Sequence, residues 1–128
     1  MAWDVEYNEA LNIVELHLSG RLSGTELQEC AAARIALGEE HGVSSFLIDA
    51  RDLIAPRSTT LSIYEIAAKT YPKSNQRRDT RIAVINPSAP ESEWIVQFYE
   101  DLCINRGWRV HMCEDRVTAL GWLHEQDT

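Results

Sequence analysis

Two short runs of apolar residues, Phe46 to Ile48 and Ile82 to Ile85, constrain the fold of this chain most. A strand with one face exposed to solvent alternates polar and apolar residues, whereas a strand buried on both faces is apolar throughout. Asp49 follows the first run, and Asn86-Pro87 closes the second. Strands of this kind occur in parallel sheets covered by helices, so the pair predicts an α/β domain.

The remaining predicted strands alternate in polarity. Trp3 to Tyr7 and Ile13 to Ser19 place apolar residues at every second position, and only the turn Asn8 to Asn12 joins them. A connection that short joins antiparallel neighbours, because a parallel return needs a much longer crossover. Trp108 to Met112 forms the last strand by the same pattern.

Helix starts are marked by capping boxes, in which a serine is followed three residues later by a glutamate. The predicted boxes pair Ser23 with Glu26, Ser62 with Glu65, and Ser88 with Glu91, and Asp115 is expected to cap a final helix. The order β-β-α-β-α-β-α-β-α predicts a single mixed, mostly parallel sheet of about five strands, the first antiparallel, covered by about four helices. We expect Ala50 to Thr60 to be a loop and Tyr71 to Arg81 to be exposed.

Length and charge limit the organisation and the partners. The 128 residues fit one domain, residues 1–128, with one core. A net charge of -8, from 20 acidic and 12 basic residues, excludes a general nucleic-acid binder, because binding to phosphates requires an excess of cations. The basic cluster between Lys73 and Arg81 is interpreted as a solvated edge rather than an anion site.

The cysteines and the N-terminus predict a cytoplasmic protein. Cys30, Cys103 and Cys113 form no CxxC pair and no zinc-like cluster with histidine, so we expect neither a structural metal nor a cofactor. An odd number of thiols suits a reducing compartment. The first residues carry acids where a signal peptide needs bases, and no run reaches the roughly 18 apolar residues that span a bilayer.

Several segments, taken in order, resemble one known family. They are Leu16 to Ser23, with a Gly-x-Leu start to a helix; Phe46 to Asp49, a strand ending in an aspartate; and Arg57 to Leu61. Together they are similar to the STAS domains related to bacterial anti-sigma-factor antagonists. Arg81 to Ile85 and Ala119 to Leu123 resemble the ending of an uncharacterised branch akin to the sporulation antagonist. The resemblance covers nearly the whole chain and implies a STAS-like fold and a regulatory module that binds a protein.

The same resemblance implies an interaction loop that contains Asp49, Arg57, Ser58, Thr59 and Thr60. Antagonist members carry Asp-Ser-Ser-Gly-Leu here and receive phosphate on the second serine, whose position holds Thr59 in this chain. Arg57 replaces the acid and Thr60 the glycine. A phosphate on Ser58 or Thr59 would lie near a helix N-terminus, where unpaired N–H groups favour negative charge. The alternative is that these hydroxyls only cap the helix or satisfy the loop backbone.

Catalytic motifs are missing from the sequence, so we expect no enzyme. Asp49 also fits the phosphate acceptor of a receiver domain, but that chemistry needs an acidic pair near the first strand and a lysine near the last. The only lysines are Lys69 and Lys73. Neither G-x-S-x-G, G-x-G-x-x-G nor a P-loop occurs. His17 and His111 fall on strand faces opposite the apolar ones, where exposure to solvent or pairing at a sheet edge is expected.

Two functions of different class follow. One is the interaction module, whose contact surface is formed by Arg51 to Thr60 and the next helix. Such a module should have a filled core. The other is a carrier of a small hydrophobic molecule or lipid, which requires an enclosed apolar pocket near the C-terminal helices. Trp94, Trp108 and Trp122 are interpreted first as core residues. Trp94 lies one position off the inward stripe that begins at Ile95 and would mark a homodimer face if exposed.

Overall fold

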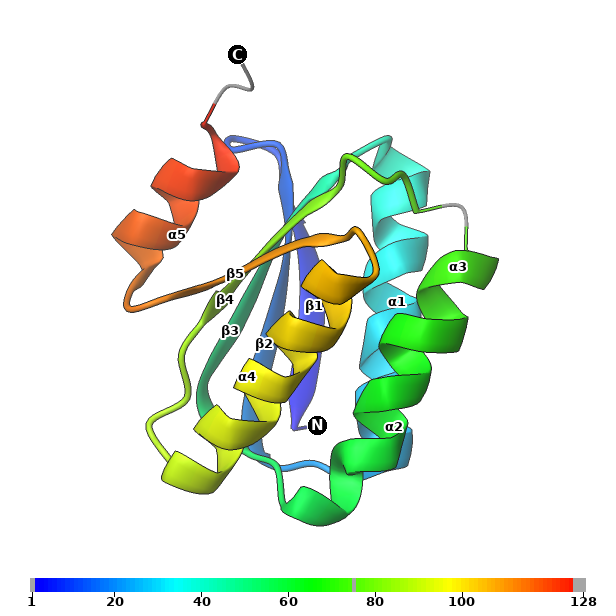
Figure 1. Ribbon diagram of the computed structural model, residues 1–128. Helices are drawn as coiled ribbons and strands as arrows, with labels where there is room; N and C mark the ends of the chain where they lie inside the picture. Colours follow the sequence, from blue (N-terminus) through cyan, green and yellow to red (C-terminus); the bar gives the residue numbers. More distant parts are fainter. Residues whose placement is uncertain (1, 75, 126–128) are drawn as a thin grey trace.

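A five-stranded sheet organises the computed structural model, which describes residues 2–74 and 76–125 (Figure 1). The strands are β1 (Trp3–Asn8), β2 (Ile13–Arg21), β3 (Ser45–Ile54), β4 (Arg81–Ile85) and β5 (Arg109–Cys113). They lie in the sheet in the order of the sequence, with β1 antiparallel to β2 and each later pair parallel. The predicted mixed sheet with an antiparallel first strand is confirmed.

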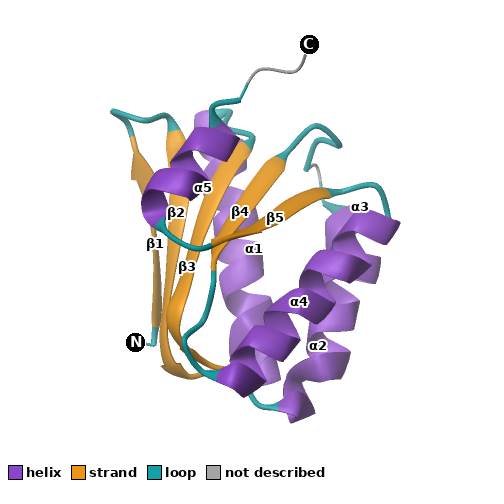
Figure 2. Ribbon diagram, turned by 60° about the vertical axis from the view of Figure 1, so that its left-hand side comes forward, coloured by secondary structure: helices purple, strands orange, loops and turns teal. Residues whose placement is uncertain are grey.

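Helices cover the two faces of the sheet unequally (Figure 2). One face carries α1 (Gly24–His41), α4 (Pro90–Asn105) and the helical segment between β3 and β4. That segment consists of the 3-10 turn η1 (Arg57–Thr59), α2 (Thr60–Glu65), the π-helical turn η2 (Ile66–Thr70) and α3 (Tyr71–Lys73). The other face carries α5 (Arg116–Leu123), which packs on β3, β4 and β5. None of the helices in the described ranges has the length and apolar character needed to cross a membrane.

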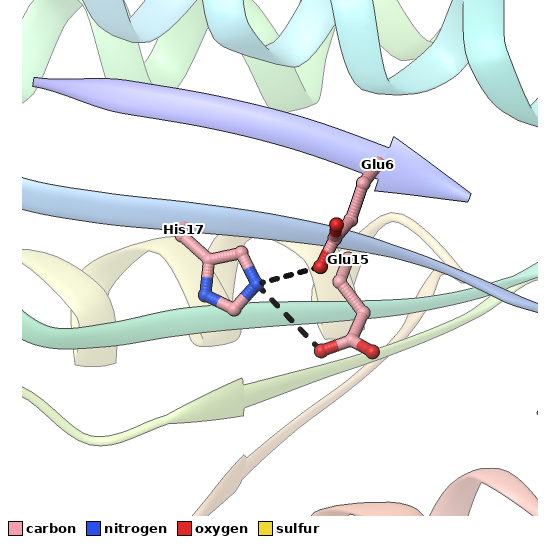
Figure 3. A group of neighbouring side chains, drawn as sticks. All are labelled: Glu6, Glu15 and His17. Carbon is pink, nitrogen blue, oxygen red and sulfur yellow. Dashed lines mark ion pairs between the residues drawn. The ribbon is translucent and has the colours of Figure 1, made fainter. Parts of the chain in front are cut away.

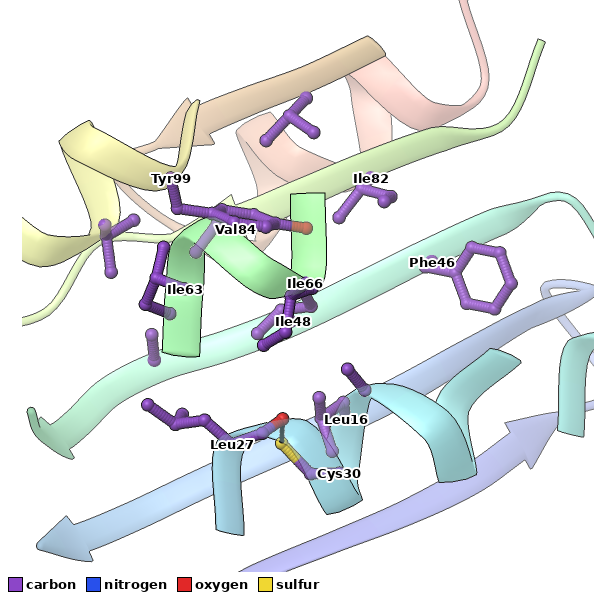
Figure 4. Close-up of a cluster of buried hydrophobic side chains, with 14 of the residues drawn as sticks. Leu16, Leu27, Cys30, Phe46, Ile48, Ile63, Ile66, Ile82, Val84 and Tyr99 are labelled. Carbon is purple, nitrogen blue, oxygen red and sulfur yellow. Dashed lines mark hydrogen bonds between the residues drawn. The ribbon is translucent and has the colours of Figure 1, made fainter. Parts of the chain in front are cut away.

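The main core fills the space between the sheet and the helices α1, α2 and α4 (Figure 4). A smaller core lies under α5 and includes Leu47, Ile85 and Ala119. Because successive strand residues point to opposite faces, Phe46 and Ile48 enter the main core while Leu47 enters the smaller one. Burial on both sides explains the uninterrupted apolar runs Phe46 to Ile48 in β3 and Ile82 to Ile85 in β4.

Two of the predicted helix caps are confirmed. Ser23 Oγ accepts a hydrogen bond from the backbone N–H of Glu26 at 3.1 Å, and the Glu26 carboxylate accepts one from the Ser23 N–H at 3.0 Å. Asp115 caps α5 by accepting a hydrogen bond from the Thr118 N–H at 2.8 Å. Each cap satisfies a backbone donor that the first helical turn leaves free.

The other two predicted capping boxes are wrong. Ser62 lies inside α2, and the carboxylate of Glu65 accepts a hydrogen bond from Gln28 of α1 instead. The box predicted for Ser88 and Glu91 does not form. Helix α4 begins at Pro90, and the residue before it, Ala89, makes no side-chain cap bond. Proline suits the first helical position because its φ angle is already helical and it has no N–H to satisfy.

The predicted loop from Ala50 to Thr60 is mostly regular structure. Strand β2 continues to Arg21, and its last residues pair with β3 as far as Ile54. Strand β3 is therefore longer than its apolar run. The helical segment then begins at Arg57. The stretch from Tyr71 to Arg81 is not fully exposed either, because the side chains of Tyr71 and Thr80 are buried.

Candidate functional site

The core of the predicted interaction loop is the first turn of a helix. Arg57, Ser58 and Thr59 form η1, and Thr60 begins α2. Thr59 Oγ1 donates a hydrogen bond to the carbonyl oxygen of Pro56 at 2.7 Å, and Thr60 Oγ1 donates one to that of Arg57 at 2.6 Å. Thr59 is only 2% exposed, whereas Ser58 faces solvent. Of these hydroxyl residues, Ser58 is therefore the most accessible to a modifying enzyme.

Arg57 joins this turn to the start of α4. Its backbone N–H donates a hydrogen bond to Glu91 Oε1 at 3.2 Å, and its guanidinium carbon lies 4.6 Å from the centre of the Trp94 ring. The Trp94 ring stacks on Phe98, with ring centres 5.7 Å apart. Both helices begin at the same end of the molecule (Figure 1). The side chains around Arg57 are thus held in place by contacts between two elements.

Exposed apolar side chains lie on the same two helices. Leu61 is 66% exposed, Trp94 42% and Tyr64 39%. Residues 57, 61 and 64 share one face of the helical segment, since residues three or four positions apart are neighbours on a helix. We name the group Arg57, Ser58, Leu61, Tyr64 and Trp94 the α2–α4 surface. Arg57 contacts Trp94 and lies on the same helix face as Leu61 and Tyr64. Exposed apolar side chains of this kind mark a candidate surface for contact with another molecule.

Asp49 does not join this group. Its carboxylate accepts two hydrogen bonds from the Arg51 guanidinium, at 3.0 and 2.7 Å, and one from the Arg51 backbone N–H at 3.2 Å. These bonds from Arg51 lower the pKa of Asp49. The structure therefore brings Arg57, Ser58, Thr59 and Thr60 together, while Asp49 lies among charged residues of β2 and β3.

Charged residues of β1, β2 and β3 lie around His17. Its Nε2 atom lies 3.6 Å from a carboxylate oxygen of Glu6 on β1 and 3.7 Å from one of Glu15 (Figure 3). Its Nδ1 atom lies 3.7 Å from a carboxylate oxygen of Asp49. The prediction that His17 lies opposite the apolar face holds, and the residue is half-buried. Neighbouring strands bring these groups together, which the spacing in the sequence does not indicate.

Glu15 is the buried member of the cluster. It is not among the site residues predicted from the sequence. Its carboxylate accepts hydrogen bonds from both terminal nitrogens of Arg116, the first residue of α5, and from Asn8. The bonds from Arg116 lower the pKa of Glu15, although burial acts in the opposite direction. Glu15 and Arg116 are 101 residues apart in the sequence, so their salt bridge leaves no local pattern from which it could be predicted.

The ligand atoms of Glu6, Glu15 and His17 are close enough together to be tested as a metal site. The residues do not fit that role well. Both oxygens of Glu15 already accept hydrogen bonds, and the oxygen nearest His17 is the one paired with Arg116 Nη1. A metal ion would have to displace the guanidinium from a buried carboxylate. We therefore interpret the cluster as an ion-pair network that fastens α5 to β2.

A small cavity lies in the main core between the sheet and the helices. Its volume is about 60 Å³, and the surface that lines it is almost entirely apolar. Pockets that hold drug-sized ligands measure roughly 300–1,000 Å³. The cavity is too small for a lipid, one of the two kinds of ligand that the carrier hypothesis allows.

The chain is similar to known proteins in structure and not in sequence. No protein-family model matches the sequence, and no curated protein matches it either. An anti-sigma factor antagonist from Mycobacterium paratuberculosis has a TM-score of 0.61 at 14% identity, over 96% of this chain and 93% of that chain. The anti-sigma factor antagonist SpoIIAA in its unphosphorylated form has a TM-score of 0.59 at 16% identity, over 99% of this chain and 100% of that chain. The chain has a STAS-like fold.

A third structure of the STAS-like fold agrees. It is an uncharacterised protein of the DUF3478 family with a SpoIIAA-like fold, from Shewanella loihica PV-4. Its TM-score is 0.58 at 17% identity, over 95% of this chain and 92% of that chain. The resemblance drawn from the motifs is thereby confirmed at the level of the STAS-like fold.

Proposed function

We propose that this chain is a non-enzymatic regulatory module that binds a protein partner through the α2–α4 surface. The observation that carries the proposal is the exposure of Leu61, Tyr64 and Trp94 beside the contact between Arg57 and Trp94. The shared fold with two anti-sigma factor antagonists supports a regulatory role.

The chemistry of this surface suits a protein contact. Tryptophan, tyrosine and arginine are the side chains most enriched at the energetic centres of protein interfaces. The Trp94 ring restrains the Arg57 side chain before a partner arrives, and Glu91 restrains the Arg57 backbone by accepting its N–H. Less side-chain freedom is then lost on binding, which favours affinity.

Phosphorylation of Ser58 is the regulatory step that we propose for this surface. The residue is exposed and adjoins Arg57, whose guanidinium lies on the Trp94 ring. A phosphate carries nearly two negative charges and forms strong hydrogen bonds with guanidinium groups. It would compete with Trp94 for Arg57 and place charge beside Leu61, so it would weaken an apolar contact. Thr59 is less suited to this role, because its hydroxyl is buried and bonded to Pro56.

The test is capture of a partner from the native host by the immobilised full chain, with identification by mass spectrometry. Leu61→Asp should weaken binding at least about tenfold, equivalent to ~1.4 kcal/mol. The matched control is Val117→Asp, which places the same charge on an exposed apolar residue of α5. Undiminished binding by Leu61→Asp, or equal loss in both variants, would refute the proposed surface.

The same assay tests the regulatory step and the homodimer. Ser58→Glu should weaken capture, and Ser58→Ala should leave it unchanged. If the partner is a second copy of the chain, sedimentation should show a dimer that Leu61→Asp dissociates and Val117→Asp does not. Equal capture by Ser58→Glu and the wild-type chain would remove Ser58 from the proposal while leaving the surface in place.

A further inference from the structure

Basic side chains gather at one end of the α2–α4 surface. Residues Lys73 to Arg81, interpreted from the sequence as a solvated edge, are joined there by Arg106, which follows the last residue of α4. Arg78 Nη1 donates a hydrogen bond to the carbonyl oxygen of Arg106. The guanidinium carbon of Arg106 lies 5.3 Å from the centre of the Tyr64 ring. Because Tyr64 belongs to the α2–α4 surface, the basic side chains are continuous with that surface.

Two lysines lie at the same end. Lys69 and Lys73 are exposed and flank Tyr71, whose ring centre lies 5.6 Å from that of Trp108. The guanidinium carbon of Arg78 lies 4.0 Å from the centre of the same Trp108 ring. These contacts bring the end of the helical segment and the loop that holds Arg78 to the start of β5. We name four residues the Arg106 cluster: Lys69, Lys73, Arg78 and Arg106.

Aromatic rings and backbone oxygens, rather than carboxylates, contact these cations. Within residues 2–74 and 76–125, no ion pair joins a carboxylate to a member of the Arg106 cluster. The acids that lie near it in the sequence bind other groups, since Asp79 pairs with Arg77 and Asp101 accepts a hydrogen bond from Gln97. The chain has 20 acidic residues against 12 basic, so acids are not scarce. The charges of the cluster are therefore available to carboxylates of another molecule.

The α2–α4 surface thus leads from apolar side chains to basic ones. Leu61 and Trp94 are exposed, and Phe98 and Leu102 follow Trp94 along α4 at intervals of four residues, on one side of the helix. Helices α2 and α4 lie side by side (Figure 2). At the usual rise of an α-helix, Trp94 and Arg106 are roughly 18 Å apart along the axis, or about three turns. A partner helix of ordinary length can therefore contact both ends.

We infer that the partner presents an acidic amphipathic helix, with apolar side chains against Leu61 and Trp94 and carboxylates on the Arg106 cluster. This inference rests on the proposed function and names the chemistry of the partner. Guanidinium groups bind carboxylates through two parallel hydrogen bonds, and complementary charge gives an interface its orientation. A nucleic acid fits less well, because the net charge of -8 repels it and the apolar side chains would remain uncovered.

The experiment measures the binding of fluorescent synthetic peptides to the full chain by anisotropy. The probe is an amphipathic helical peptide with leucines along one face and glutamates at one end, and the comparison peptide has glutamines in place of the glutamates. The acidic peptide should bind at least about tenfold more tightly than the neutral one. The preference should shrink as ionic strength rises, because salt screens exposed charges. Equal binding of the two peptides, or no binding of the acidic peptide at millimolar concentration, would overturn the inference.

A charge reversal locates the acidic end of the peptide. Arg106→Glu should abolish the preference for the acidic peptide. The matched control is Arg21→Glu, which makes the same change at an exposed arginine on the end of β2 and should keep the preference. Equal loss in both variants would show an effect of net charge alone and contradict the assignment.

A second variant keeps the test decisive if Arg106→Glu disturbs the end of α4. Lys69→Glu combined with Lys73→Glu reverses two exposed charges of the cluster on a different element. This variant should also lose the preference for the acidic peptide. An undiminished preference would remove the lysines from the contact and overturn the cluster as its basic end.

Two further outcomes separate this inference from the proposed function. If both peptides bind equally and Leu61→Asp weakens both, the α2–α4 surface stands and the acidic partner is refuted. If Arg106→Glu removes binding of the acidic peptide while Leu61→Asp leaves it unchanged, the proposed function is refuted instead. Tighter binding of a short DNA duplex than of the acidic peptide would overturn the assignment to a protein partner.

Discussion

Arg116 is the side chain that joins α5 to the strands of the opening hairpin, through the buried carboxylate of Glu15. In Arg116→Met that carboxylate keeps its hydrogen bond from Asn8 but loses its positive partner. A buried acceptor that loses its partner costs about 1–3 kcal/mol, so we expect a loss of that size in the free energy of unfolding. Urea denaturation near neutral pH measures it.

The pH dependence of this loss has a definite sign. Hydrogen bonds from Arg116 hold the pKa of Glu15 below its ordinary value of 4.5, so the pair stabilises the fold above that pH and ceases to do so as the pH falls through the lowered pKa. The difference between wild type and Arg116→Met should therefore shrink on acidification. Arg51→Met is the control, since Arg51 is exposed and its pair with Asp49 is screened by solvent. An equal loss in both variants would contradict the role given to burial.

At the scale of the helix, the confirmed and the wrong capping boxes give a matched pair of substitutions. Ser23→Ala removes the cap of α1 and should cost about 1 kcal/mol. Ser88→Ala changes the serine of a predicted box that the structure does not form, because α4 begins later, at Pro90. We expect almost no change in the unfolding midpoint for Ser88→Ala. A similar loss for both serines would show that the cap geometry of α1 is not the cause.

Two helical glycines should respond in opposite directions to alanine. A Cβ at Gly121 of α5 meets nothing within 4 Å, so Gly121→Ala should raise stability by roughly 0.5–1 kcal/mol, the usual advantage of alanine in a helix. A Cβ at Gly38 of α1 would lie 2.5 Å from the ring of Phe46, so Gly38→Ala should lower stability. Thermal unfolding of the two variants checks both signs, and a stabilising Gly38→Ala would contradict the packing of α1 on β3.

How far the sequence predicts each element depends on the range of the interactions that form it. The cap of α1 is predictable because Ser23 and Glu26 bond to each other within one turn. The end of β3 is not, because pairing with the last residues of β2 extends it beyond its apolar run. The same distinction holds for the candidate site. Its local part is predictable, since Arg57 to Thr60 form one turn. The contact of Arg57 with Trp94 needs a second helix, which residue patterns alone do not place.

At the scale of the whole molecule, the thiols report on unfolding. Cys30, Cys103 and Cys113 are all buried, and burial raises the pKa of each thiol. Thiolates are the reactive form, so labelling by a disulfide reagent should be slow in the folded protein and should rise with urea along the unfolding curve. Ser58→Cys is the control, because an exposed thiol should react at once. Fast labelling of a native cysteine would show that its surroundings open separately from the rest.

The order of the strands has a consequence for where any partner can bind. In doubly wound sheets, the strand order reverses direction, and the loops diverge at that point to leave a crevice for a ligand. Here each crossover steps to the adjacent strand in the same direction, and all the crossover helices lie on one side. Such a singly wound layer has no reversal point along its parallel strands and hence no ready-made crevice of that kind. A binding partner of this architecture is therefore expected on an outer surface of the fold, and not in a crevice at a point where the strand order reverses.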